Sequence, residues 1–321
     1  MDIFRWAYIG SGSIARTTAK SITKGDHKIT AVYSRNPDTA AAFAEKYGAT
    51  TYPSAEAAMT AGDVDGVYIA TPHTSHLAYA VQAMQLGKPV LCEKPVGVSL
   101  QEAQTLVQTA KSCGVYFCEG MWTWFSDVAL TVKDWVQSGK IGEVKQVEIH
   151  YAFPGMRMRK DSRVRLPETA GGALLDIGIY PVAYCYNLFG VPQSVRCEGT
   201  LQDGIDVCET VTLGYDGFSC VLRTGLTSLK ERCVIEGSSG TIRLGFFHMA
   251  SKAVLKTGGK RMVFQGKTDY LTEFTRAAQE IRAGKTESAY IPFDATLACM
   301  EILDTCRAQM GLVYPFERGT L

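Results

Sequence analysis

The chain lacks long hydrophobic runs and an excess of charge of either sign. No segment approaches the ~20 uninterrupted apolar residues that a membrane-spanning helix needs. The 33 lysines and arginines nearly balance the 32 aspartates and glutamates, which leaves a formal charge of +1. No global field therefore attracts nucleic acid or an anionic membrane surface, and we expect neither as a partner.

Cysteine patterns typical of metal and redox sites are also missing. The ten cysteines include no CxxC pair and no Cys/His cluster at metal-ligand spacing, so we expect no bound metal. Their scatter through helix-like and strand-like runs, as at Cys92, Cys118, Cys185 and Cys220, indicates buried thiols. The chain enters the run over 3–7 without a charged head and a cleavable apolar core, so we expect a reducing, cytoplasmic location.

A glycine-containing turn follows the first apolar run, over 6–9, and leads into a helical segment. The residues of the turn are Gly10, Ser11, Gly12, Ser13 and Ile14. Glycines there permit a tight turn and a close approach to a pyrophosphate, whose charge the helix N-terminus favours. Such a turn also occurs without a nucleotide, but its place directly after a strand favours nucleotide binding.

The end of the next predicted strand, Lys28 to Ser34, indicates which nucleotide binds. NAD-binding folds place an acidic residue there to bond the adenosine ribose. This sequence instead has Ser34 and Arg35, and the arginine can bind a 2′-phosphate through charge-assisted hydrogen bonds. We therefore favour NADP over NAD. The alternative is that Arg35 is a solvated loop residue, and Asp38 is interpreted as an early-helix acid.

Polar residues follow the predicted strand over 66–70. They are Thr71, Pro72, His73 and His76. Open α/β sheets bind ligands at the carboxyl ends of their strands, so we expect these residues beside the cofactor. His76 can equally cap or brace the next helix.

An acidic and a basic residue, Glu93 and Lys94, end the next apolar run. The ring of Pro95 disfavours the α region for its predecessor, so the backbone holds Lys94 extended and aims its side chain. A surface charge is the alternative interpretation of an isolated lysine. We expect Lys94 at the catalytic site and Glu93 beside the cofactor, with a structural pairing as the alternative for Glu93.

The order of the predicted elements indicates an α/β protein. Five strands alternate with helices before residue 120, which implies a Rossmann domain with a doubly wound parallel sheet over residues 1–121. Strand-like runs joined by short glycine-containing turns dominate from Gly142 onwards. We expect residues 122–321 to form an α+β domain for substrate binding and dimerisation, with a large, mainly antiparallel sheet and one open face.

Aromatic and basic residues of the second half are candidates for substrate binding. Trp122, Trp124 and Phe125 follow a strand end, and they either seal a domain junction or form a substrate wall with Phe153. The segment from Arg157 to Arg165 carries five basic residues. It is either a solvated loop or a site for an anionic ligand group, with Arg157 as a substrate candidate.

The glycine-rich segment 171–181 carries two more polar candidates. Residues four apart share a helical face, so Asp176 and Tyr180 can point the same way if the segment is helical. Pro181 suits the first turn of such a helix. A core tyrosine bonded to a helix-capping aspartate is the alternative.

Three motifs together resemble the glucose-fructose oxidoreductase/inositol dehydrogenase (Gfo/Idh/MocA) superfamily. They are the early glycine turn, Glu93-Lys94-Pro95, and Gly171-Gly172 through Asp176-x-Gly178-x-Tyr180. The segments 119–125 and 171–180 are similar to the branch that holds dimeric dihydrodiol dehydrogenases and NADP-dependent xylose dehydrogenases. The resemblance covers nearly the whole chain. It implies that Lys94, Asp176 and Tyr180 surround the substrate carbon beside the nicotinamide, that the Lys94-Pro95 bond is cis, and that the open sheet face forms a homodimer.

Oxidation of a hydroxyl requires a base, because a proton leaves the oxygen as hydride leaves the carbon for the nicotinamide. We expect Tyr180 as this acid/base, Lys94 as an ammonium that favours its phenolate, and Asp176 as an orienting group. The sequence thus predicts an NADP-dependent dehydrogenase of a cyclic sugar or vicinal diol. A reductase of a ketosugar, osone or dicarbonyl uses the same residues in reverse. A catalytically silent NADP-binding sensor or regulator is the alternative outside enzymes.

Overall fold

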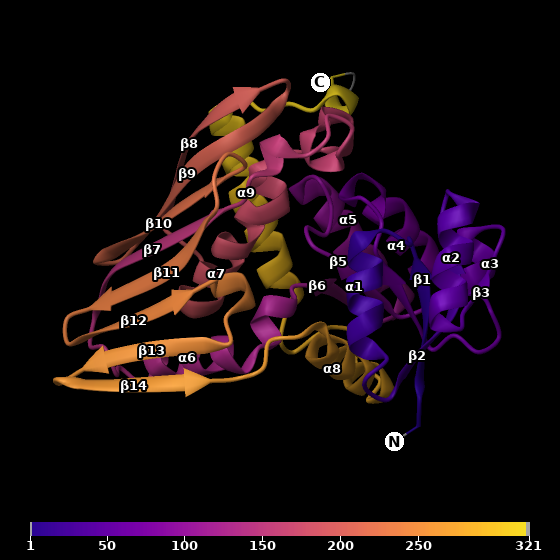
Figure 1. The fold of residues 1–321 in the computed structure, drawn as a ribbon, viewed down its shortest axis with the longest axis horizontal. Coiled ribbons are helices and arrows are strands. Elements are labelled where there is room, and N and C mark those ends of the chain that lie inside the picture. The colour runs from indigo at the N-terminus through magenta and orange to yellow at the C-terminus, as the bar shows by residue number, and fades with distance from the viewer. Residues whose placement is uncertain (1, 319–321) are drawn as a thin grey trace. The chain divides into compact units, whose positions relative to one another are not determined.

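The computed structural model describes residues 2–318 and divides into two compact units. Unit 1 comprises the chain up to Trp122 together with Asp269–Leu297, and unit 2 comprises Thr123–Thr268 together with the chain from Ala298. Figure 1 shows the chain coloured along its length. Unit 1 therefore includes a late segment, 269–297, that the predicted boundary assigns to the second domain.

The late segment packs against the first sheet of unit 1 through Phe274. Phe274 is fully buried, and its ring centroid lies 5.1 Å from that of Trp6 and 4.8 Å from that of Tyr68. Both partners belong to the first sheet. A long-range hydrophobic contact of this kind leaves no local signal in the sequence, which is why the boundary differs.

Unit 1 is built on a six-stranded parallel sheet of order β3-β2-β1-β4-β5-β6. Its strands are β1 (Phe4–Ile9), β2 (His27–Tyr33), β3 (Thr50–Thr51), β4 (Gly66–Ile69), β5 (Val90–Glu93) and β6 (Phe117–Gly120). The strand order reverses between β1 and β4, and open sheets bind ligands at such a switch point. The predicted doubly wound parallel sheet is confirmed, with the short β3 added to the five expected strands.

Several helices of unit 1 begin or end at residues that cap helices. The helices of this unit are α1 (Ser13–Ile22), α2 (Pro37–Tyr47), α3 (Ala55–Met59), the 3-10 turn η1 (His73–Ser75), α4 (His76–Gln85), α5 (Leu100–Cys113) and α8 (Tyr270–Arg282). Asn36 caps α2 by accepting hydrogen bonds from the next two amides, and Gly48 ends it in the left-handed region. Ser54 and Ser99 cap α3 and α5.

Unit 2 holds an eight-stranded sheet of order β14-β13-β12-β11-β7-β10-β9-β8 (Figure 1). Its strands are β7 (Val144–Ala152), β8 (Ser194–Gln202), β9 (Ile205–Tyr215), β10 (Phe218–Gly225), β11 (Lys230–Gly237), β12 (Gly240–Gly245), β13 (Lys252–Thr257) and β14 (Lys260–Gln265). Among the described strands of this sheet, only β7 and β10 pair in parallel, so the predicted mainly antiparallel sheet is confirmed. Buried and exposed residues alternate along β12, as in a sheet with one covered face.

The remaining helices and turns complete the chain. They are η2 (Trp122–Phe125), α6 (Asp127–Gln137), η3 (Gly155–Arg157), η4 (Arg163–Arg165), η5 (Pro167–Thr169), the π-helix η6 (Leu174–Gly178), α7 (Ile179–Phe189), η7 (Phe247–Met249), α9 (Phe293–Met310) and η8 (Pro315–Glu317). α6 packs against β13 and β14, and α7 packs against β7 and β10. No described helix combines the length and hydropathy that crossing a lipid bilayer requires.

The cysteines are free thiols throughout the described chain. Cys92, Cys118, Cys185 and Cys220 are buried, as the sequence predicts, whereas Cys113 at the end of α5 is exposed. The described residues contain no group of three or more His, Cys, Asp or Glu side chains that could hold a metal ion.

Candidate functional site

A hollow of about 200 Å³ lies at the carboxyl edge of the sheet in unit 1. It is lined by Gly10, Ser11, Gly12, Arg16, Tyr33, Ser34, Arg35, Thr39, Ala70, Thr71, Pro72 and Tyr79. The structure thus brings together predicted cofactor residues that follow three different strands, namely Gly10, Ser11, Gly12, Ser34, Arg35, Thr71 and Pro72. Because β1 and β4 flank the switch point of the sheet, this is the place where the fold binds ligands.

Two glycines shape the hollow for different reasons. Gly10 has a φ of 107°, and a Cβ there would lie 2.7 Å from the carbonyl oxygen of Ala70, so the turn after β1 requires glycine. Gly12 is the N-cap of α1 with a φ of −70°, and a Cβ there would have nothing within 4 Å. Folding therefore does not require glycine at position 12. Its small size instead leaves the first amides of α1 open to a phosphate.

Hydroxyl and guanidinium groups form the wall beyond β2. Ser11 Oγ donates to Thr39 Oγ1 at 2.9 Å, and Ser34 Oγ lies 3.4 Å from the same oxygen. The exposed Arg35 follows, and none of the described lining residues carries a carboxylate. This donor set fits the 2′-phosphate of NADP, because no anion is present to repel it.

Five lining residues are absent from the sequence prediction: Arg16, Tyr33, Thr39, Ala70 and Tyr79. Arg16 lies in the first turn of α1, so its distance of one turn from Gly12 is a signal that could have identified it. Tyr33 and Tyr79 come from β2 and α4, with ring centroids 6.3 Å apart. Burial raises the pKa of Tyr79, which keeps its hydroxyl available as a donor. No sequence spacing links these two tyrosines.

The other cofactor candidates lie outside the lining of the hollow. Ser13 and Ile14 begin α1, and His73 is buried in η1. His76 Nδ1 lies 2.9 Å from the carbonyl oxygen of Pro95, and its Nε2 lies 2.9 Å from that of Thr71. His76 thus braces the loops that follow β4 and β5.

Lys94 stands at the carboxyl end of β5, and its bond to Pro95 is cis. Two buried carboxylates lie close by, Glu93 at the end of β5 and Glu119 in the neighbouring strand β6. Glu93 accepts a hydrogen bond from the hydroxyl of Tyr68, which is the structural pairing predicted as its alternative role. Glu119, to which the sequence prediction gives no role, accepts hydrogen bonds from the amide of Val96 at 3.0 Å and from Thr296 Oγ1 at 3.1 Å.

Glu119 titrates under the influence of its surroundings. Burial raises the pKa of Glu119 to about 7, while its two hydrogen bonds and the Lys94 ammonium oppose the rise. Glu273 of α8 is fully buried, and burial followed by the nearby carboxylates Glu93 and Glu119 raises its pKa well above the ordinary value. Glu93, Glu119 and Glu273 thus influence one another, and the Lys94 ammonium acts on Glu119. Burial favours the protonated forms of Glu119 and Glu273.

In unit 2, the segment 174–178 is helical, as the predicted shared face of Asp176 and Tyr180 requires, but it forms a π-helix rather than an α-helix. The amide of Ile179 bonds the carbonyl of Leu174, five residues back. Pro181 lacks the N–H that an α-helix would use to bond Ile177, which removes one regular hydrogen bond from this turn. Asp176 lies in the π-helix and Tyr180 lies in α7, so the four-residue spacing of an α-helix does not place them on one face.

Gly172 is required immediately before the π-helix. It has a φ of 125°, and a Cβ there would collide with the carboxylate of Asp206. Asp206 is fully buried and accepts the amide hydrogen of Leu174 at 2.6 Å. The glycine and the carboxylate together fix the start of the segment that carries Asp176.

Asp176 is paired with the basic segment. Arg163 Nη2 donates to Asp176 Oδ1 at 2.7 Å, and the aspartate side chain is 11% exposed. Arg165 donates to the carbonyls of Met156 and Met158, whereas Arg157 is exposed. Part of the basic segment therefore holds the site aspartate rather than forming only a solvated loop.

Tyr180 lies near the start of α7 in a cluster of rings. Its centroid is 5.9 Å from that of Tyr151 and 5.6 Å from that of His248, and its side chain is buried. Tyr151 comes from β7 and His248 from η7. Neither residue appears in the sequence prediction, because nothing in their spacing connects them with Tyr180.

The aromatic candidates for a substrate wall are packed within their own units. Trp122 lies 4.6 Å from Tyr270 between ring centroids, in unit 1. In unit 2, Trp124 is 5% exposed and Phe125 is 3% exposed. Phe153 is half-buried and packs against a hydrophobic cluster that includes Ile177 and Leu226. Each of these residues has a packing role.

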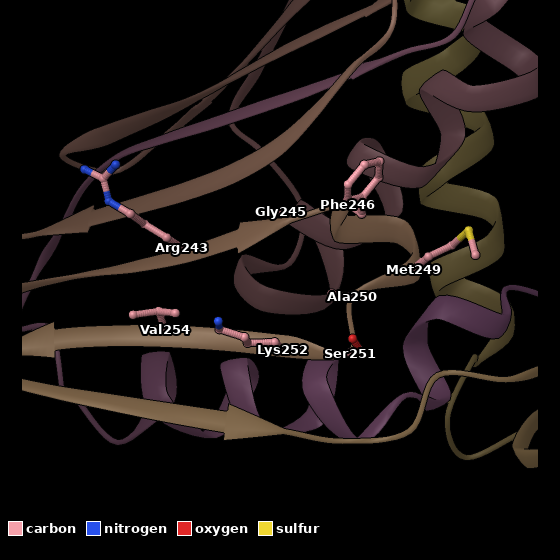
Figure 2. A pocket seen from close by; sticks show the side chains of 8 residues that line it. All are labelled: Arg243, Gly245, Phe246, Met249, Ala250, Ser251, Lys252 and Val254. Atoms are coloured by element: carbon pink, nitrogen blue, oxygen red, sulfur yellow. The ribbon is translucent and has the colours of Figure 1, made fainter.

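A second hollow, of about 570 Å³, lies on unit 2 where β12, η7 and β13 meet (Figure 2). Its lining includes Arg243, Phe246, Met249 and Lys252. Phe246 is 63% exposed and Met249 is 58% exposed, so the hollow has an apolar rim. None of the predicted catalytic or cofactor residues lines it.

Two family models match successive parts of the chain. The model described as an oxidoreductase family with an NAD-binding Rossmann fold matches residues 4–121. The model described as the GFO/IDH/MocA C-terminal domain matches residues 129–243. The first match contains the strands and turns that line the hollow of unit 1, and the second contains Asp176 and Tyr180.

Relatives match over nearly their whole length. The scyllo-inositol 2-dehydrogenase (NADP(+)) IolU of Bacillus subtilis is 32% identical over 330 residues, covering 99% of this chain and 100% of the relative. The trans-1,2-dihydrobenzene-1,2-diol dehydrogenase of Mus musculus is 27% identical over 335 residues, covering 98% and 99%. Among solved structures, the 3-ketoreductase KijD10 of Actinomadura kijaniata, in complex with NADP and TDP-benzene, has a TM-score of 0.87 at 23% identity, covering 96% of this chain and 98% of its own, and supports the fold alone.

Proposed function

Because this chain belongs to the Gfo/Idh/MocA oxidoreductase family, we propose that it exchanges hydride between NADP and a hydroxyl-bearing carbon of a cyclic sugar or a vicinal diol. The two relatives described above are named for scyllo-inositol and for a dihydrobenzene diol. Both compounds are rings with neighbouring hydroxyl groups. Full-length similarity to such enzymes supports an oxidoreductase that acts on sugar-like substrates.

The observation that carries the cofactor assignment is the wall at the end of β2. Arg35 and Ser34 line the hollow there, and its described lining contains no carboxylate. The guanidinium can make charge-assisted hydrogen bonds to a 2′-phosphate, which NAD lacks. The amides at the N-terminus of α1, left open by Gly12, suit the pyrophosphate.

NADP supplies the hydride acceptor, so the protein has to handle the proton. We assign that proton to the Tyr180 hydroxyl, with Lys94 as the ammonium that stabilises the phenolate. Asp176 orients the substrate hydroxyl, and its charge-assisted hydrogen bond from Arg163 fixes the position of the aspartate. In the reduction direction Tyr180 returns the proton to the carbonyl oxygen.

The test is an absorbance assay at the NADPH band with a panel of pentoses, hexoses, diols and dicarbonyls, run in both directions. Turnover of a sugar or diol that Tyr180→Phe abolishes supports the proposal. Turnover of osones or dicarbonyls alone replaces it with a reductase. NADPH binding without turnover of any compound replaces it with a sensor.

We also propose a homodimer formed through the open face of the eight-stranded sheet. Exposed apolar side chains on unit 2, among them Phe246 and Met249, support this arrangement. Sedimentation analysis should give a dimer that Phe246→Asp dissociates. A monomeric wild-type protein at micromolar concentration contradicts the proposal.

A further inference from the structure

A chain of hydrogen bonds in unit 2 links three side chains that have no part in the proposed reaction. Glu231 of β11 and Tyr151 of β7 lie directly opposite each other in the antiparallel ladder. His248 of η7 contacts both of them. Its Nδ1 is 2.6 Å from Glu231 Oε1, and its Nε2 is 3.0 Å from the Tyr151 hydroxyl. The imidazole thus joins two strand residues that face each other.

Glu231 fixes the orientation and the tautomer of this imidazole. The same Oε1 also accepts the backbone N–H of His248 at 2.8 Å, and the glutamate side chain is only 4% exposed. An ionised carboxylate can only accept hydrogen bonds, so Nδ1 carries the proton that faces it. In this tautomer the unprotonated nitrogen, Nε2, faces the hydroxyl of Tyr151.

Tyr151 is the donor in the second hydrogen bond. Burial raises the pKa of Tyr151, and the carboxylates of Glu231 and Asp176 raise it further, so the phenol keeps its proton near neutral pH. Its ring also stacks on His248, with centroids 4.4 Å apart and planes inclined by 21°. The imidazole therefore holds both the ring and the hydroxyl of Tyr151.

The two held rings are the ring neighbours of Tyr180, at the centroid distances of 5.9 Å and 5.6 Å given above. We propose that Glu231, His248 and Tyr151 form a positioning triad for Tyr180. The carboxylate sets the imidazole tautomer, the imidazole holds Tyr151, and the two rings fix the orientation of the Tyr180 phenol for proton transfer. The inference rests on the proposed role of Tyr180 as the acid/base.

Two substitutions remove the link between His248 and Tyr151. Tyr151→Phe deletes only the hydroxyl, and His248→Asn keeps an amide donor for Glu231 but is too short to reach Tyr151. Each should lower kcat by about tenfold or more, while the dissociation constant for NADPH stays within about twofold. Steady-state kinetics on the best compound of the panel and fluorescence titration with NADPH measure the two quantities.

Tyr184→Phe is the matched control. Tyr184 lies one turn further along α7, its ring centroid is 5.7 Å from that of Phe247 in η7, and its buried hydroxyl has no hydrogen-bond partner in the described chain. This substitution deletes a buried phenol hydroxyl next to the same turn without breaking the triad. Its kcat should equal that of the wild type.

Nitrogen NMR of histidine-labelled protein reads the tautomer directly. The chain has five histidines, and His248→Asn identifies the signal of interest. We expect His248 protonated at Nδ1 in the wild type and in Tyr151→Phe. Glu231→Gln should lose this preference and also lower kcat, a combination that a purely structural role would not produce.

The outcomes separate the triad from the proposed function. Wild-type kcat in Tyr151→Phe and Glu231→Gln, with activity lost in Tyr180→Phe, overturns the triad and leaves the function standing. Protonation of His248 at Nε2 in the wild type also overturns the triad. Activity retained by Tyr180→Phe overturns the proposed function itself. If His248→Asn fails to fold, the other two variants decide.

Discussion

The hollow of about 200 Å³ in unit 1 and the ring cluster of unit 2 (Tyr151, Tyr180 and His248) are built in opposite ways. The hollow is lined largely by the turns directly after β1, β2 and β4, with small and hydroxyl-bearing residues and open amides. The ring cluster joins bulky side chains from β7, α7 and η7, elements that lie far apart in the sequence, and Glu231 of β11 bonds its histidine. The first therefore depends on backbone geometry, and the second depends on the identity of individual side chains.

Lys94→Met should have the largest effect and tests whether Lys94 belongs with the chemistry or with the nucleotide. If its ammonium stabilises the Tyr180 phenolate, kcat should fall by about a thousandfold, roughly 4 kcal/mol, while NADPH affinity stays within about threefold. Kinetics and fluorescence titration measure these, with the exposed Lys20→Met as control. Weakened NADPH affinity with unchanged kcat would assign Lys94 to the nucleotide side instead.

Arg35→Asp tests whether a single side chain in the hollow of unit 1 selects NADP over NAD. A carboxylate at this position repels a 2′-phosphate and accepts a hydrogen bond from a ribose hydroxyl. The ratio of kcat/KM for NADP to that for NAD should fall by about a hundredfold. Lys28→Asp, at the exposed other end of β2, should leave the ratio unchanged. An unchanged ratio in Arg35→Asp would show that the arginine does not select the cofactor.

Glu119→Gln tests a buried side chain that supports unit 1. Burial raises the pKa of Glu119 from 4.5 to about 7, so the folded protein prefers the protonated form. The contribution of protonated Glu119 to the free energy of unfolding is complete below about pH 4.5 and is lost as the pH rises through about 7. Glu119→Gln should therefore remove a fall of about 2 to 3 kcal/mol in the free energy of unfolding between these limits.

Urea denaturation at acidic and mildly alkaline pH measures this fall. The exposed Glu45→Gln should retain the wild-type dependence. If the free energy of unfolding of Glu119→Gln falls with pH as in the wild type, other groups, such as Glu273, cause the pH dependence.

Substitutions of Gly10 and Gly12 should give the smallest effects, and they test directly whether the hollow of unit 1 depends on backbone geometry. Gly12→Ala should weaken NADPH binding by about tenfold without changing the thermal midpoint, because a Cβ there meets only the ligand. Gly10→Ala should lower the thermal midpoint as well, because its Cβ would clash with Ala70. Calorimetry and NADPH titration separate the two. Equal loss of stability in both variants would contradict the assigned difference.

The parts of the fold that the sequence predicted correctly have local causes. Asn36, Pro37 and Gly48 bound α2 because capping and left-handed termination involve only neighbouring residues. The turn at Gly10 was identified for the same reason. The strand β14 has no such local signal, because its residues are mostly exposed and include Lys260, Arg261 and Gln265, so no buried alternation marks it.

The contacts of the candidate site in unit 2 could not be predicted because they join distant segments. The pairing of Arg163 with Asp176 depends on the turns between them. The contact of His248 with Tyr151 depends on the register of β7 and β11, which only the folded sheet defines. Residue types identified Tyr180 as a candidate, but its ring neighbours required the structure.

The π-helical turn at Leu174–Gly178 holds more residues per turn than the α-helix that follows it. Loss of a single codon in this stretch would restore a regular helix and rotate the preceding residues by about 100° relative to α7. A different side chain would then stand where Asp176 now meets Arg163. A deletion or insertion at this turn would therefore exchange the group that meets Arg163 in one step, without any substitution of Asp176 itself.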